Sequence, residues 1–145
     1  MDTLSKLFSR LPRYVWIMLS VAWMTFIFFL SSRQRIAVSE QYWTNFMVFK
    51  SLHVIEYAIL SMLNTMALIK NTNGITMKTA ALYGAILALV YAISDETHQS
   101  FVPTRTGQPQ DVLIDSIGIF SVYWFITQYE KNKKGPTTPL RPRTP

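Results

Sequence analysis

Side chains able to move protons or to hold an anion gather in three short stretches of this sequence. Carboxylates beside an imidazole can act as general acid and base, and an arginine can hold a phosphate or carboxylate through two parallel hydrogen bonds. We expect Asp95, Glu96 and His53 to be catalytic. We expect a substrate to contact Lys50, Tyr57, Gln99, Arg105, Asp111 and Asp115. The three stretches therefore predict one polar site for binding or for proton transfer.

Each stretch has polar residues at helical spacing. The sets are Lys50, His53 and Tyr57; Asp95 and Gln99; and Asp111, Asp115 and Gly118. Residues three, four or seven apart lie on one face of an α-helix, so each set is predicted to share a face. A glycine on such a face lets a neighbouring backbone approach closely, which predicts tight helix packing at Gly118.

A divalent cation is a further ligand that these residue types suggest. Carboxylate oxygens suit hard cations, and the candidate ligands are His53, Asp95, Glu96 and Asp111. The chain lacks cysteine and the zinc-binding spacing His-Glu-x-x-His. It also lacks a Gly-rich phosphate loop. We therefore expect no bound metal and no cofactor.

Four long apolar blocks must position these side chains. The 145-residue chain is 50% hydrophobic and 15% charged, whereas a soluble domain is about a quarter charged. The blocks predict membrane-spanning helices over about residues 14–32, 46–69, 79–94 and 111–129. The expected fold class is all-α, a four-transmembrane-helix bundle over residues 1–130, with a flexible, basic and proline-rich tail over residues 131–145. A cleaved signal peptide is the alternative for the first block, but its apolar run is longer than usual and no small-residue cleavage site follows it.

The positions of the basic residues predict the orientation of this bundle. Most of the 14 lysines and arginines lie before the first block, between the second and third blocks, or after the fourth. Because the cytoplasmic side of membrane proteins carries the excess of lysine and arginine, both termini are predicted to be cytoplasmic. The polar site of this multi-pass cell-membrane protein then faces the non-cytoplasmic side. The net charge of +6 does not indicate nucleic-acid binding, because the charges flank apolar blocks and no nucleic-acid motif accompanies them.

The order of the polar stretches resembles that of the VanZ-like family. The residues that carry the resemblance are Phe29-Leu30-Ser31-Ser32; Lys50, His53, Tyr57 and Leu60; Asp95-Glu96-Thr97-His98-Gln99; Phe101, Pro103 and Arg105; and Asp111-Val112, Asp115 and Gly118. They cover about residues 14–128. The resemblance implies a cell-envelope role, with membrane lipids or lipid-linked cell-wall precursors as partners. It also implies an effect on susceptibility to the glycopeptide teicoplanin.

Three functions remain open at this point. The first is an enzyme that acts on a lipid-linked or cell-wall substrate. The second is non-catalytic binding of a lipid headgroup or of a glycopeptide. The third, a small transporter, is the least favoured, because the first block has no ionisable residue between Tyr14 and Leu30.

Overall fold

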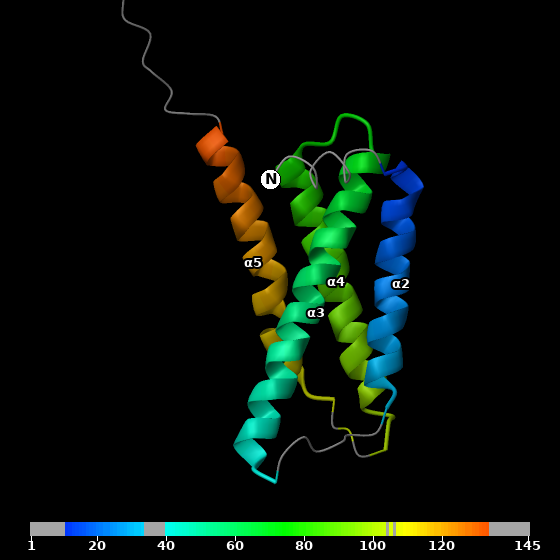
Figure 1. Ribbon diagram of the computed structural model, residues 1–145, viewed down its shortest axis with the longest axis vertical. Helices are drawn as coiled ribbons and strands as arrows, with labels where there is room; N and C mark the ends of the chain where they lie inside the picture. The colour runs from blue at the N-terminus through cyan, green and yellow to red at the C-terminus, as the bar shows by residue number, and fades with distance from the viewer. Residues whose placement is uncertain (1–10, 34–39, 104, 106, 134–145) are drawn as a thin grey trace, which may run out of the picture.

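The computed structural model describes residues 11–33, 40–103, 105 and 107–133, which contain four long α-helices (Figure 1). They are α2 (Arg13–Ser31), α3 (Tyr42–Asn71), α4 (Met77–Gln99) and α5 (Pro109–Lys133). Each helix is long and apolar enough to cross a membrane, which confirms the expected all-α fold with four spans. Large apolar side chains such as Met18, Val90 and Trp124 are exposed on the outside of the bundle, as lipid-facing positions would be.

Short sequence signals account for where α4 and α5 begin. The Thr76 side chain accepts a hydrogen bond from the backbone N–H of Thr79 at 3.1 Å, which caps the first turn of α4. Pro109 is the first residue of α5, a position where the missing N–H of proline costs little. Asp111 lies in the first turn of α5, where the partial positive charge of the helix end stabilises a carboxylate.

The end of α4 differs from its expected position. We expected this span to stop at Ser94 and to leave the following acidic residues at the outer surface, but the helix continues to Gln99. Asp95, Glu96 and Gln99 are buried inside the bundle. Charged side chains interrupt a hydropathy pattern without interrupting backbone hydrogen bonds, so the helix continues wherever those side chains find partners. At the other end of the chain, α5 includes residues 131–133 of the predicted tail, and residues 134–145 lie outside the described residues.

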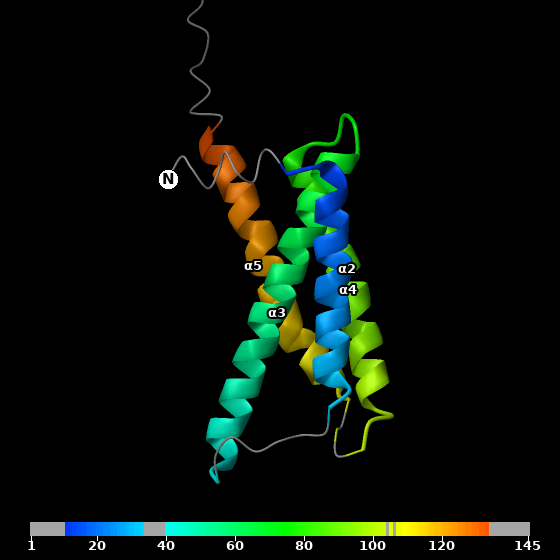
Figure 2. The ribbon, with the colours of Figure 1, turned by 45° about the vertical axis from the view of Figure 1, so that its right-hand side comes forward.

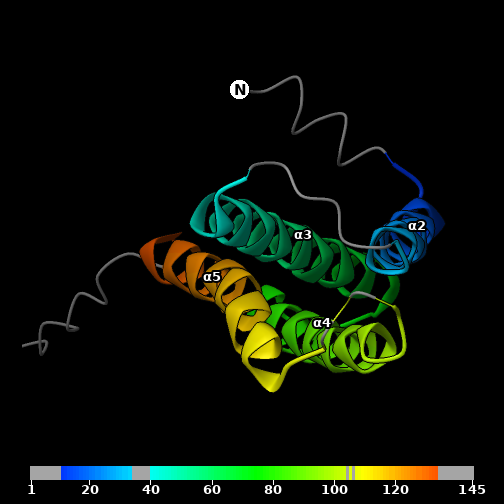
Figure 3. The same ribbon diagram turned by 90° about the horizontal axis from the view of Figure 1, so that it is seen from below.

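The central helix of the bundle is α3, which packs against α2, α4 and α5. The helices α4 and α5 also pack on each other, whereas α2 contacts α4 only briefly and, among the described residues, does not touch α5. The start of α2 and the end of α5 lie at one end of the bundle, and the end of α4 and the start of α5 lie at the other (Figures 1 and 2). Seen end-on, α2 and α5 lie on opposite sides of the α3–α4 pair (Figure 3).

Small residues set how closely the helices approach. The buried face of α4 includes Ala85, Ala88 and Ala92, which belong to the apolar core. At Gly118 of α5, an added Cβ would overlap the backbone carbonyl oxygen of Val54 in α3. Small side chains allow this close approach between membrane helices, so the tight packing predicted at Gly118 is confirmed.

Two hydrogen bonds from aromatic side chains tie the middle of α2 to its neighbours. The Trp23 indole N–H donates to the backbone carbonyl of Glu56 in α3 at 3.0 Å. The Tyr91 hydroxyl of α4 donates to the backbone carbonyl of Met24 in α2 at 2.5 Å. Both bonds use backbone oxygens, so they fix the position of α2 without using a side chain of the polar site.

Candidate functional site

The predicted site residues meet at the end of the bundle where α4 ends and α5 begins. A cavity of about 240 Å³ lies there. Its polar wall includes Lys50, His53, Asp95, Gln99, Arg105 and Asp111 from the predicted set. The remaining predicted residues, Tyr57, Glu96 and Asp115, are buried. The structure therefore places six predicted residues on one cavity.

Asp95 accepts hydrogen bonds from two other predicted residues. The Tyr57 hydroxyl donates to Asp95 Oδ2 at 3.1 Å, and Gln99 Nε2 donates to the same oxygen at 3.0 Å. Asp95 is 3% exposed, and its other oxygen, Oδ1, has no hydrogen-bond partner among the described residues. One oxygen of this carboxylate is thus held by the protein, and the other is buried without a described hydrogen-bond partner.

Glu96 is held by the connection between α4 and α5. Its Oε1 accepts a bond from Gln99 Nε2 at 3.2 Å, and its Oε2 accepts the backbone N–H of Gln108 at 3.2 Å. A Cβ added at Gly107 would overlap the backbone carbonyl oxygen of Glu96, so a glycine is needed for the connection to fold back this closely. Glu96, Gly107 and Gln108 also line a second cavity, of about 410 Å³. The sequence identified Glu96 but not Gln108, because the contact uses a backbone N–H.

Arg105 connects the end of α2 to the end of α4. Its Nε donates to the backbone carbonyl of Arg33 at 3.0 Å, and its Nη2 donates to that of Leu30 at 3.1 Å. Its Nη1 donates to Gln99 Oε1 at 3.4 Å. Cations are favoured at the carbonyl end of a helix, which explains why the guanidinium lies beside the last turn of α2. Arg105 therefore positions this end of the bundle, and its predicted contact with an anion stays a prediction.

Lys50 and Asp111 form an ion pair between α3 and the first turn of α5. The ammonium Nζ lies 2.5 Å from Asp111 Oδ1, and both side chains are about 15% exposed. Removing one partner of such a sheltered pair leaves an uncompensated charge, which is costly. This pair therefore holds α5 against α3 at the edge of the cavity.

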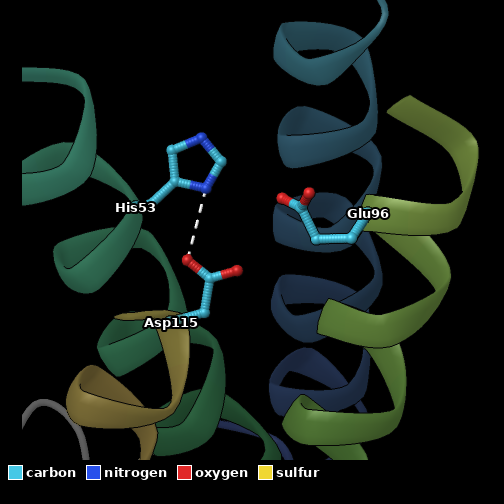
Figure 4. A group of neighbouring side chains, drawn as sticks. All are labelled: His53, Glu96 and Asp115. Carbon is cyan, nitrogen blue, oxygen red and sulfur yellow. Dashed lines mark ion pairs between the residues drawn. The ribbon is translucent and has the colours of Figure 1, made fainter. Parts of the chain in front are cut away.

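His53, Asp115 and Glu96 point toward one another from three different helices (Figure 4). His53 Nδ1 lies 3.3 Å from Asp115 Oδ1. Asp115 is fully buried, and neither of its oxygens has a hydrogen-bond partner among the residues that the structure describes. One ligand atom from each of the three side chains lies within 4.8 Å of the others. Because buried polar atoms are nearly always satisfied, this group is a place where a ligand would supply missing partners.

Sequence reasoning missed two charged residues that line the cavity. Glu56 lies three residues after His53, and this helical spacing is the signal that could have placed both on one wall. Arg33 follows the end of α2, and its guanidinium lies 5.0 Å from the centre of the Phe29 ring. No spacing rule links Arg33 to the other residues, because it reaches the cavity only through the folding of the bundle.

Comparisons with known proteins find a family match over most of the chain. The sequence profile of the family described as VanZ/LLP1 matches residues 16–129, which include every residue of the cavity walls. No curated protein and no solved structure matches the chain.

Proposed function

The chain belongs to the VanZ/LLP1 family, and from this premise we propose that it acts in the cell envelope on a lipid-linked or cell-wall component. The polar headgroup of a membrane lipid or lipid-linked cell-wall precursor would bind in the 240 Å³ cavity. Glycopeptide susceptibility, including that to teicoplanin, would change because the precursors that such antibiotics meet would change.

The observation that carries this proposal is the mixed lining of the cavity. Apolar side chains contribute to it, among them Ile27, Leu30, Phe49 and Leu52. Charged and amide side chains line the same cavity. Ligand sites commonly combine an apolar surface with a few placed polar groups. An amphiphile would suit this lining, with its hydrocarbon against the apolar side chains and its headgroup against the polar ones.

The polar wall also supports a chemical role. His53 borders the cavity and contacts the buried carboxylate of Asp115, which is the arrangement of a base oriented by a third group. Asp95 and Glu96 supply two further carboxylates within one turn of α4. Lys50 would hold an anionic headgroup by its charge, as lysines commonly do for phosphate. Proton transfer to or from the bound component is the reaction class that these groups suit.

We further propose that the cavity faces the non-cytoplasmic side, which the distribution of lysine and arginine supports. The chain has no cysteine, so a single introduced thiol reports its own side of the membrane. In intact cells a membrane-impermeant maleimide should label Glu40→Cys, before α3, and should not label Asn73→Cys, between α3 and α4. The reverse labelling would contradict this orientation.

The function is tested by comparing envelope lipids and cell-wall precursors, by mass spectrometry, in bacteria that express the full chain or an empty vector. We expect the wild type to change at least one component, and His53→Ala and Glu96→Gln to abolish the change. Glu40→Gln is the matched control, because it neutralises an exposed carboxylate before α3, outside the cavity. Profiles that are identical with and without the wild-type chain would contradict the proposal.

Non-catalytic binding is the second candidate. It is favoured by the hydrogen bonds that already hold Asp95 and Gln99 within the protein, since groups fixed in this way suit recognition. In this case a lipid or precursor would copurify with the wild type and leave it chemically unchanged. The same mass spectrometry separates the two functions, because only an enzyme changes the amounts of two related components in opposite directions.

A further inference from the structure

We propose that His53, Glu96 and Asp115 bind one divalent first-row transition-metal cation, of the class of Zn²⁺ or Mn²⁺. The three side chains come from α3, α4 and α5, so one ion would join the three helices that form the packed core (Figure 4). This proposal departs from the sequence-based expectation of no metal, which rested on the absence of a local zinc-binding spacing.

The geometry suits a single ion. One atom from each side chain already lies within 4.8 Å of the other two. In a tetrahedral site with metal–ligand bonds of about 2.1 Å, ligand atoms lie about 3.4 Å apart. The side chains therefore need to close by little more than 1 Å, which rotations about their own bonds can supply.

The second observation is the unsatisfied state of Asp115. Its side chain is 1% exposed and points toward His53 and Glu96. Neither carboxylate oxygen accepts a hydrogen bond from any described residue, and the buried His53 Nδ1 atom also lacks one. Glu96 accepts one hydrogen bond at each oxygen, which leaves lone pairs on both oxygens for an ion. Among the described residues, the Asp115 carboxylate has one polar contact, with His53 Nδ1 at 3.3 Å, and a carboxylate buried to this degree calls for further partners or a metal.

The charge of the surroundings points the same way. The charged side chains that line the cavity or belong to the His53–Glu96–Asp115 group fall into two sets. The carboxylates are Glu56, Asp95, Glu96, Asp111 and Asp115. The permanent cations are Arg33, Lys50 and Arg105. Five carboxyl groups therefore lie beside three permanent cations, and a divalent cation would meet more acidic than basic side chains here.

The donor set indicates the class of ion. One imidazole nitrogen suits Zn²⁺, which is borderline, and two carboxylate oxygens suit Zn²⁺ or the harder Mn²⁺; Ca²⁺ is disfavoured because it prefers six to eight oxygens. Three protein ligands also leave a coordination position open, as in catalytic rather than structural zinc sites. His53 borders the first cavity and Glu96 the second, so the open position can be reached from either side.

The test uses the purified full chain in detergent, stripped with EDTA and titrated with ZnCl₂ or MnCl₂ alone in a calorimeter. Metal content after dialysis is measured by mass spectrometry. We expect one ion per chain, and at least tenfold weaker binding in Asp115→Asn and His53→Ala. The controls Glu40→Gln and Glu130→Gln remove a carboxylate elsewhere, the second at the opposite end of α5, and should bind within twofold of the wild type.

Three results would overturn the proposal: a wild type that takes up no ion, uptake that survives Asp115→Asn and His53→Ala together, or uptake that the two controls lower equally. Circular dichroism and gel filtration establish whether each variant is folded. If one variant fails to fold, the wild-type titration still shows whether the chain binds an ion. The titration measures uptake of an ion and the lipid comparison measures envelope components, so a failed titration would leave the headgroup proposal standing. A negative lipid comparison would likewise leave the metal site standing.

Discussion

Replacing Gly118 by alanine is expected to push α5 away from α3. The new Cβ would overlap the carbonyl oxygen of Val54 and lie 3.1 Å from the backbone nitrogen of Ala58. Both obstacles are backbone atoms inside a helix, so neither can rotate aside as a flexible side chain would. The only relief is a movement of one helix relative to the other.

Two effects of opposite sign determine how much Gly118→Ala changes the folding free energy. Alanine is favoured over glycine inside a helix by about 1 kcal/mol. Inserting a methyl group into a filled contact costs about 1–3 kcal/mol, and an obstacle of backbone atoms places this case near the upper end. The net expectation is a loss of about 2 kcal/mol of folding free energy. For a chain of this length, that corresponds to a fall in Tm of roughly 5–10 °C.

The measurement is the thermal stability of the purified chain, followed by gel filtration with fluorescence detection after heating. The matched control is Ile117→Val, which changes one methyl group at the neighbouring position, where the side chain is 62% exposed. The control should stay within about 0.5 kcal/mol of the wild type, as exposed substitutions usually do. A Gly118→Ala chain as stable as the wild type, or more so, would refute the close helix approach.

The remaining predictions concern single contacts of the site. Tyr57→Phe removes a donor to the buried Asp95 carboxylate and should cost about 1–3 kcal/mol, measured as a lower Tm. Arg105→Lys cannot reproduce the forked contacts to two carbonyls at the end of α2, so hydrogen–deuterium exchange should rise at residues 28–33. A double-mutant cycle with Lys50→Met and Asp111→Asn should give a coupling of about 0.5–3 kcal/mol; additive effects would show that the ion pair contributes nothing.

The sequence predicts the spans well because apolar blocks of this length rarely form anything except transmembrane helices. Hydropathy alone places the end of α4 too early, because it falls at Asp95 while the helix continues to Gln99, as the helical spacing of these two residues indicates. A charged side chain marks the edge of the lipid hydrocarbon only if it points outward from the bundle. Asp95 and Glu96 are instead buried inside the bundle. A boundary placed at the first charge is therefore too early whenever the charge has a partner inside.

Helical spacing predicts which polar residues share a face, but not which faces meet. Lys50 and His53 do line the same cavity, as their spacing indicates. Its pairing with Asp111, and that of His53 with Asp115, depends on how α5 crosses α3. Two contacts of Arg105 could not be predicted for a different reason: they end on the backbone oxygens of Arg33 and Leu30, and backbone atoms are the same for every residue type.

The peripheral position of α2 separates two tasks within one small protein. This helix supplies Ile27 and Leu30 to the lining of the cavity, yet it contributes no member of the His53–Glu96–Asp115 group and has no contact with α5 among the described residues. Substitutions on its inner face would therefore resize the cavity while His53, Glu96 and Asp115 keep their positions. Under the proposed function, selectivity for the tail of an amphiphile and action on its headgroup would then be open to change one at a time.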